Sequence, residues 1–212
     1  MGDLGAPLVA AAAHALAAGV AARTVVLVEG VSDQFALEAL AARRGRDLAA
    51  EGIAVMPTGG ATTIGRFLTQ LGPQGSDIRL AGMYDAAEED GVRRRLERAG
   101  LGANLTRVDM EALGFFVCVA DLEDELIRAL GAAAVEQVLD ADGELGSFRI
   151  FQQQPAHRGE SRTAQLHRFM GTRSGRKIRY GRLLVDALDL TRVPRPLDLL
   201  LAHLASVDGP VA

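Results

Sequence analysis

The sequence contains very little cysteine and lysine, and it has no tryptophan. Cys118 is the only cysteine among 212 residues, and it lies inside the apolar run Phe115–Val119. A disulfide framework and a zinc site built from cysteine are therefore both excluded. A chain without disulfides suits a reducing compartment, and we expect the cytoplasm. Lys177 is the only lysine among the 23 basic residues, so 22 are arginines.

Long hydrophobic runs are also missing. The most apolar stretch near the N-terminus, Leu8–Ala22, is rich in alanine, contains His14 and lacks a basic segment before it. It is a poor secretory signal and too short to span a bilayer, so we expect no membrane association. We interpret residues 1–22 as an N-terminal amphipathic helix that leans on the domain or joins a partner.

Short apolar runs alternate with helical patterns over residues 23–130. A buried strand is predicted where β-branched and apolar residues run to a glycine or an acid, and a helix where apolar residues recur at helical spacing. Ser32 stands where the N-cap of the first helix is expected. The predicted strands are Thr24–Val28, Ile53–Met56, Ile78–Tyr84 and Gly114–Ala120. The predicted helices are Asp33–Arg44, Ala61–Leu71, Ala86–Ala99 and Leu122–Leu130. This alternation predicts an open, doubly wound α/β sheet of about four parallel strands flanked by helices.

The strand signal fades after Gly131, and we predict a helical C-terminal extension over residues 131–212. Its expected helices are Ala132–Leu139, Arg162–Met170, Tyr180–Leu188 and Leu197–Ala205. Residues 156–195 carry ten basic residues against three acids, whereas the rest of the chain carries 13 against 24. Such asymmetry suits a protein that holds cations at one place and phosphates at another, although arginines that merely solvate helix faces would give the same count.

Carboxylates follow three of the predicted strands. Glu29 comes directly after the first strand, Asp85 after the third, and Asp121 and Glu123 after the fourth, while Asp33 lies one helical turn beyond Glu29. The carboxyl ends of parallel strands meet at one edge of a sheet, where ligands bind. Clustered carboxylates repel one another unless a cation lies between them, and hard oxygen ligands favour Mg²⁺ or Mn²⁺.

Each of these acids also has an interpretation without a metal. Asp33 and Asp121 could only favour helix N-termini, and Asp85 could be a turn residue. Glu29 is harder to explain in that way, because a carboxylate beside a buried strand is costly unless something compensates it.

The motifs around these acids resemble those of TOPRIM domains, especially in the overcoming-lysogenization-defect (OLD) family of nucleases. The matching segments are Leu27–Asp33 followed by Phe35–Leu37, then Gly82–Asp85, and then Asp121–Asp124. The resemblance covers roughly residues 23–130, with a weaker match at Gly175–Lys177. It implies a TOPRIM Rossmann-like catalytic core that cuts phosphodiesters with Mg²⁺ or Mn²⁺. It also implies proton transfer by Glu29 and assistance to catalysis by Lys177, which could otherwise be only a surface charge.

Two departures from the family pattern bear on activity. The second acidic motif normally reads Asp-x-Asp, but here Asp85 is followed by Ala86 and Ala87, and only Glu88, Glu89 or Asp90 could substitute for the missing acid. OLD nucleases commonly carry an ATPase region, yet this sequence has no phosphate-binding Gly-x-x-x-x-Gly-Lys-Ser/Thr loop. Any ATP dependence would then need a separate ATPase subunit.

The leading hypothesis is a metal-dependent DNA endonuclease, with RNA and a homodimer both left open. Its metal would be held by Glu29, Asp33, Asp85, Asp121 and Glu123. Its nucleic-acid backbone would be held by arginines in and beside one helix, namely Arg173, Arg176, Arg179 and Arg182. The alternative is a weakened TOPRIM module that binds nucleic acid or a partner ATPase without cutting. A third hypothesis is a phosphatase or nucleotidyl-transfer domain acting on small substrates.

Overall fold

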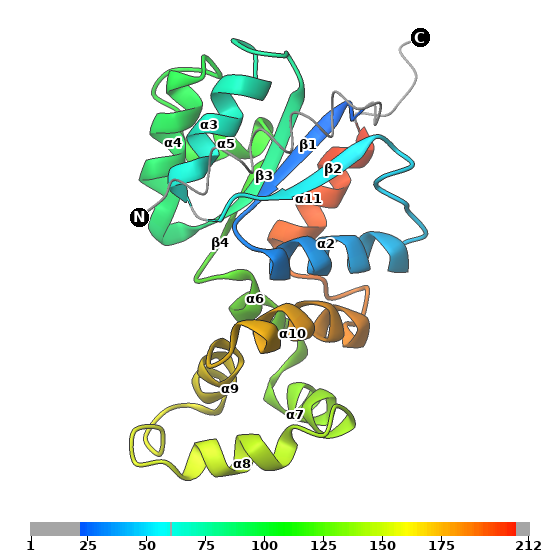
Figure 1. The fold of residues 1–212 in the computed structure, drawn as a ribbon, viewed down its shortest axis with the longest axis vertical. Helices are drawn as coiled ribbons and strands as arrows, with labels where there is room; N and C mark the ends of the chain where they lie inside the picture. Colours follow the sequence, from blue (N-terminus) through cyan, green and yellow to red (C-terminus); the bar gives the residue numbers. More distant parts are fainter. Residues whose placement is uncertain (1–21, 60, 207–212) are drawn as a thin grey trace.

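The computed structural model describes residues 22–59 and 61–206, so the predicted N-terminal helix over residues 1–22 lies almost entirely outside the described part. The sheet has four parallel strands in the order β2-β1-β3-β4. The strands are β1 (Thr24–Val28), β2 (Ile53–Pro57), β3 (Arg79–Asp85) and β4 (Phe115–Cys118). The predicted open parallel α/β sheet is confirmed (Figure 1).

Helices cover both faces of the sheet because each strand alternates apolar side chains between the two faces. One face packs on α3 (Ala61–Leu71), α4 (Glu89–Arg98) and α5 (Arg107–Ala112). The other packs on α2 (Val31–Arg43) and on α11 (Arg195–Ser206), the last described helix. Residues 131–206 therefore do not lie wholly apart from the sheet, since α11 returns to pack against β4 and β3.

The remaining helices form a layer beyond the carboxyl ends of the strands (Figure 1). They are α6 (Leu122–Leu130), α7 (Ala132–Ala141), α8 (Leu145–Gln153), α9 (Arg162–Gly171) and α10 (Ser174–Ala187). One hydrophobic core runs without a break from Val26 and Val28 of the sheet through α2 to Phe148 and Phe169 of this layer. No helix among the described residues is long and apolar enough to cross a membrane.

Several local predictions need correction. The N-cap of α2 is Gly30 and not Ser32, because the chain enters the helix two residues early and the carboxylate of Asp33 accepts a hydrogen bond from the Gly30 amide at 2.8 Å. The helix predicted over 86–99 begins as a short 3-10 turn, Ala86–Glu88, before α4. Two short helices, α5 and α8, were not predicted.

Candidate metal centre

The acidic residues lie at the carboxyl edge of three neighbouring strands. In the sheet β1 pairs with β3 and β3 pairs with β4, all parallel, so the three strands deliver their following residues to the same edge. Glu29 follows β1, Asp85 is the last residue of β3, and Asp121 follows β4 by two residues. The prediction that these acids gather at one edge therefore agrees with the geometry.

A pocket of about 350 Å³ opens between this edge and the helical layer. Five of the predicted acidic or basic site residues line it directly, and a sixth, Glu123, contacts the lining residue Lys177. The pocket is lined by Glu29, Gly30, Val31, Ser32, Asp33, Gly59, Asp85, Asp121, Lys177 and Ile178.

Glu29 and Asp85 interact closely on the lining of this pocket. Burial, the charge of Glu29 and a hydrogen bond to Glu29 together raise the pKa of Asp85 to about 8. Asp85 therefore keeps its proton near neutral pH. Glu29 itself is exposed, so the argument that it is a costly buried charge is wrong, and its place on the pocket lining is what keeps it a candidate site residue.

Asp33 is the buried member of the first motif. Its carboxyl group is 9% exposed and lies in the first turn of α2, against the Gly30 amide. Burial and the charge of Glu123 raise its pKa to about 7, although the Gly30 hydrogen bond and Lys177 act against that shift. Because burial and nearby acids raise its pKa to about 7, this carboxyl group can lose its proton near neutral pH and then bind a cation.

Glu123 is the most deeply buried of these acids. Its side chain is buried on α6, and neither carboxylate oxygen has a hydrogen-bond partner among the described residues. Its charged contact is the Lys177 ammonium, with Nζ 3.0 Å from Oε2. A buried carboxylate without hydrogen bonds is costly, so the residue types and burial fit a site that receives a positive ion.

The helical layer supplies the positive groups. Lys177 on α10 also lies 3.9 Å from the Asp121 carboxylate, and His167 on α9 places Nε2 2.8 Å from the same carboxylate. Burial raises the pKa of Asp121, but hydrogen bonds from His167 and the Asp124 amide outweigh it, and the net pKa is below its ordinary value. A lone histidine on a helix gives no local sequence signal of such a contact, so His167 was not among the predicted site residues.

Lys177 is held in place by a close approach of two helices. Gly181, one turn further along α10, packs against the backbone of Ser32 on α2, where an added Cβ would lie 2.6 Å from the Ser32 carbonyl oxygen. A side chain at this position would push α10 away from α2 and carry Lys177 with it.

Among the described residues, no three acidic, histidine or cysteine side chains already converge on a point that an ion could occupy. The cation among these acids is Lys177, which neutralises Glu123 in the metal-free protein. The donor set of carboxylate oxygens nevertheless fits Mg²⁺ or Mn²⁺. Glu29, Asp33, Asp85, Asp121 and Glu123 are the residues that would hold such an ion.

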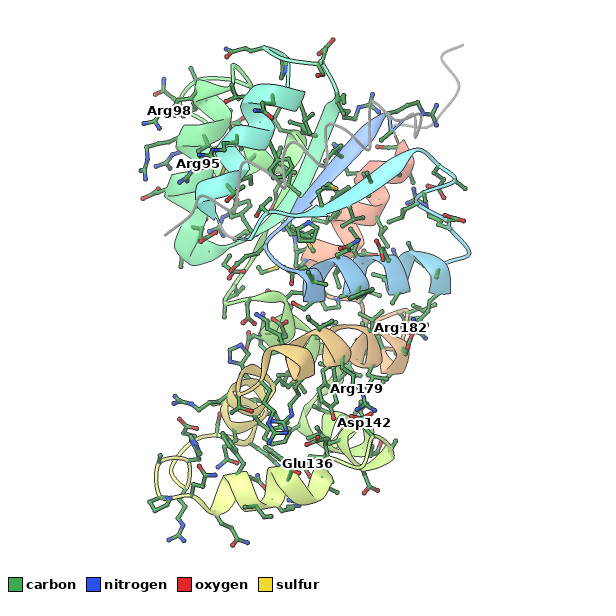
Figure 2. All side chains as sticks on the ribbon, in the orientation of Figure 1. Arg95, Arg98, Glu136, Asp142, Arg179 and Arg182 are labelled. Atoms are coloured by element: carbon green, nitrogen blue, oxygen red, sulfur yellow. The ribbon has the colours of Figure 1, made fainter. Side chains whose placement is uncertain are left out.

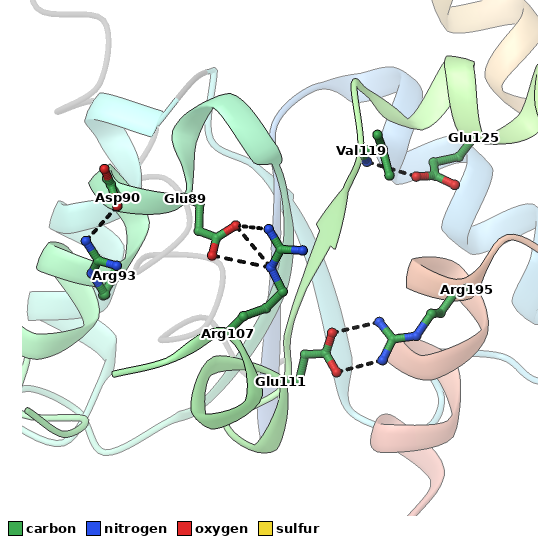
Figure 3. A network of polar contacts seen from close by, with 8 residues as sticks. All are labelled: Glu89, Asp90, Arg93, Arg107, Glu111, Val119, Glu125 and Arg195. Carbon is green, nitrogen blue, oxygen red and sulfur yellow. Dashed lines mark hydrogen bonds and ion pairs between the residues drawn. The ribbon is translucent and has the colours of Figure 1, made fainter. Parts of the chain in front are cut away.

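Two of the acids that follow Asp85, Glu89 and Asp90, do not replace the missing acid of the second motif. Ala87 is exposed in the 3-10 turn after Asp85. Glu89 pairs with Arg107, and Asp90 pairs with Arg93 at 2.6 Å, so both carboxylates are engaged outside the pocket (Figure 3). The described pocket lining does not include Glu88.

The arginines predicted to hold nucleic acid are largely paired with acids. Arg176 is buried, stacks on Phe169 and pairs with Glu144 at 2.8 Å, so the prediction that it contacts a phosphate backbone is wrong. Arg179 pairs with Asp142 across the helical layer (Figure 2), and Arg182 lies 3.6 Å from Asp186. Arg173 is exposed before α10.

The same holds for much of the basic C-terminal third. Arg162 pairs with Glu136, and Arg195 pairs with Glu111 of α5 at 2.7 Å (Figure 3). A count along the sequence suggests a basic surface in this region. In the fold, acids from other helices pair with many of these arginines and neutralise their charge.

Comparisons with known proteins agree with this geometry. Residues 21–86 match the family model of the overcoming lysogenization defect protein-like TOPRIM domain. The predicted resemblance to OLD TOPRIM domains is confirmed. The matched residues include Glu29, Asp33 and Asp85. TOPRIM domains are typically found in nucleases and topoisomerases.

Solved structures extend the similarity beyond the TOPRIM match. The C-terminal region of the Burkholderia pseudomallei OLD protein has a TM-score of 0.65 and 20% identity, over 88% of this chain and 98% of that one. The C-terminal region of the Xanthomonas campestris pv. campestris OLD protein has a TM-score of 0.64 and 25% identity, over 88% and 95%. No curated protein matches the chain.

The raised pKa of Asp85 predicts how the metal-free fold responds to pH. The folded state keeps a proton on Asp85 up to a pKa of about 8, whereas the unfolded state loses it near the ordinary value of 3.8. The folded state then binds more protons, so stability falls as pH rises through this window. Asp85→Asn removes the titration and is expected to stabilise the metal-free protein near its upper end, on the order of 1–2 kcal/mol after solvent screening.

Thermal melts in EDTA across this pH window, for wild type and Asp85→Asn, measure the effect. Asp186→Asn, an exposed position on α10, is the matched control. Parallel pH curves for wild type and Asp85→Asn would contradict the raised pKa of Asp85.

Proposed function

We propose that this chain is a nuclease that hydrolyses DNA phosphodiesters with Mg²⁺ or Mn²⁺ bound at the acidic pocket. The observation that carries the proposal is the set of acids at one sheet edge, which includes buried Glu123 without hydrogen bonds. Clustering of this kind lowers the stability of the metal-free protein, and a divalent cation relieves it. The similarity to OLD TOPRIM domains supports the same chemistry.

The protein groups have separate tasks in this proposal. A bound divalent ion would supply charge screening for the attacked phosphate. Glu29 lies at the exposed rim beside Asp85, where it can accept a proton from an attacking water. As water adds to phosphorus, the bond to the leaving oxygen breaks, and that oxygen then needs a proton or a positive charge.

Lys177 is placed to stabilise the leaving oxygen. Its ammonium faces the pocket from α10, half-buried, with Glu123 at 3.0 Å. Burial lowers the pKa of Lys177, but the charges of Glu123 and Asp121 outweigh this, and the net pKa is raised, so the group stays protonated at neutral pH. A compact ammonium of this kind can approach a developing oxyanion closely.

One observation favours a second function. Ala87 leaves the second acidic motif one carboxylate short, and neither Glu89 nor Asp90 turns toward the pocket. A domain that binds nucleic acid, or a partner ATPase, without cutting would tolerate this loss. Such a module would show salt-sensitive DNA binding and no turnover with any metal.

A plasmid-nicking assay separates these functions. Supercoiled plasmid is incubated with the protein in Mg²⁺, in Mn²⁺ and in EDTA, and Glu29→Ala protein purified in parallel controls for contaminating nuclease. We expect nicked circles with either ion and none in EDTA. Nicking that persists in EDTA, or its absence with both ions, would reject the metal-dependent nuclease in favour of the alternative.

A further inference from the structure

A groove lined by arginines lies between α3 and α4, apart from the acidic pocket. It has a volume of about 440 Å³, and no carboxylate residue stands among its described lining residues. The lining residues are Gly65, Arg66, Thr69, Gln70, Arg95 and Arg98. Arg95 and Arg98 lie at the upper left of the molecule, whereas Arg179 and Arg182 lie lower, in the helical layer (Figure 2).

The acids of α4 are engaged elsewhere, which leaves the groove positive. Glu89 pairs with Arg107, Asp90 with Arg93, and Glu97 accepts a hydrogen bond from the Leu105 amide at 3.0 Å. No described acidic side chain pairs with Arg95 or Arg98. Arg95, half-buried, and Arg98, exposed, are therefore guanidinium groups to which an anion could bind.

Two glycines inside helices make room for the Arg95 side chain. A Cβ added at Gly65 of α3 would lie 3.3 Å from Arg95 Cδ, and one added at Gly91 of α4 would lie 2.7 Å from Arg95 Nη1. Glycine inside a helix is unfavourable compared with alanine, so its presence at both contacts is informative. The two glycines therefore leave the space that the Cδ and Nη1 atoms of Arg95 occupy at the groove.

The groove and the acidic pocket lie along the same two helices. Gly59, just before α3, and Asp85, at the end of β3 before α4, both line the acidic pocket. The groove residues lie further along α3 and α4, which pack side by side. A polymer that enters the pocket could therefore continue along this groove, whereas a small substrate would have no use for it.

We infer that the α3–α4 groove binds the phosphate backbone of the DNA duplex whose phosphodiester is proposed to be cut at the acidic pocket. This inference rests on the proposed function and adds a second contact for the same substrate. Arginine forks match phosphate oxygens, and each phosphate contact releases counterions, so the interaction weakens as salt rises.

The test is fluorescence anisotropy with a labelled DNA duplex of about 30 base pairs in EDTA, over a salt series. We expect Arg95→Ala/Arg98→Ala to weaken binding about tenfold at low salt and to reduce the salt slope by about two. Arg94→Ala, on the same helix but outside the groove, is the control and is expected to change affinity less than about twofold. Equal losses in the double variant and the control would overturn the inference.

A second variant moves Arg95 without removing its charge or harming the fold. Gly91→Ala fills the space occupied by Arg95 Nη1, while alanine favours the helix. We expect a melting temperature no lower than that of wild type, together with weaker duplex binding. Unchanged binding would show that Arg95 placement is irrelevant and would overturn the inference.

Competition distinguishes a backbone site from a site for free anions. We expect unlabelled duplex to displace the labelled duplex, and inorganic phosphate at the same total phosphate concentration to leave it bound. Equal displacement by both would assign the groove to free anions instead. Because EDTA prevents metal-dependent cleavage, failure here leaves the nicking result unaffected, and a protein without nuclease activity can still pass this test.

Discussion

Glu29→Ala is expected to reduce metal-dependent plasmid nicking by roughly 10³-fold or more. Glu29 lies at the pocket rim, its charge and hydrogen bond act on Asp85, and its charge acts on Asp33. Its loss removes a proposed metal ligand and the proposed proton acceptor in one step. Because Glu29 is exposed, the variant should remain folded, and its circular dichroism spectrum should match that of wild type.

The matched control is Glu38→Ala, which removes the same charge from α2 outside the acidic pocket. Glu38 accepts a hydrogen bond from Gln34 at 2.9 Å, so its replacement costs one local contact. Gel-based nicking rates should be close to wild type for Glu38→Ala and at background for Glu29→Ala. Equal rates for Glu29→Ala and wild type would remove the acidic pocket from the mechanism.

Gly181→Val is expected to lower the free energy of unfolding by about 2–3 kcal/mol or more, because the side chain would meet backbone and not a movable side chain. The contact is the Ser32 carbonyl of α2, and neither helix can move without opening the shared core. Displacing α10 also moves Lys177 away from Glu123. Urea denaturation measures the loss of stability, and nicking rates report the displaced ammonium.

Gly175→Ala provides the control within the same helix. No atom lies within 4 Å of a Cβ built at Gly175, which is exposed. This change should raise stability by about 0.5–1 kcal/mol through helix propensity alone. If Gly181→Val unfolded at the urea concentration of wild type, the close packing of α10 on α2 would not be what positions Lys177.

The sheet could be predicted from the sequence because its signals are local. Each strand is a short apolar run that stops at an acid, a proline or a glycine, and parallel order follows from strand and helix alternation. The start of α2 was predicted two residues late. The Gly30 amide donates its hydrogen bond to Asp33 inside the helix, so the N-cap residue itself carries no capping side chain that the sequence could reveal. Short helices such as α5, with six residues, carry too little periodicity to be recognised.

The acidic half of the site was also predictable, because strand ends fix where Glu29, Asp85 and Asp121 must lie. The contact of His167 with Asp121 joins residues 46 positions apart and leaves no pattern in the chain. The prediction of a basic surface in the C-terminal third failed because the ion pairs there also join residues far apart in the chain. Its arginines are paired with acids such as Glu136, whose positions relative to them depend on the packing of α7, α9 and α10.

The continuous hydrophobic core has a consequence for how the two halves of the site depend on each other. Phe148 and Phe169, beyond the strand ends, share a single apolar interior with Val26 and Val28 in the sheet. Cooperative unfolding of that interior would separate Lys177 and His167 from the acids in the same event. The helical layer is thus a fixed wall of the pocket, and a cleaving fragment could not be made by cutting the chain after α6.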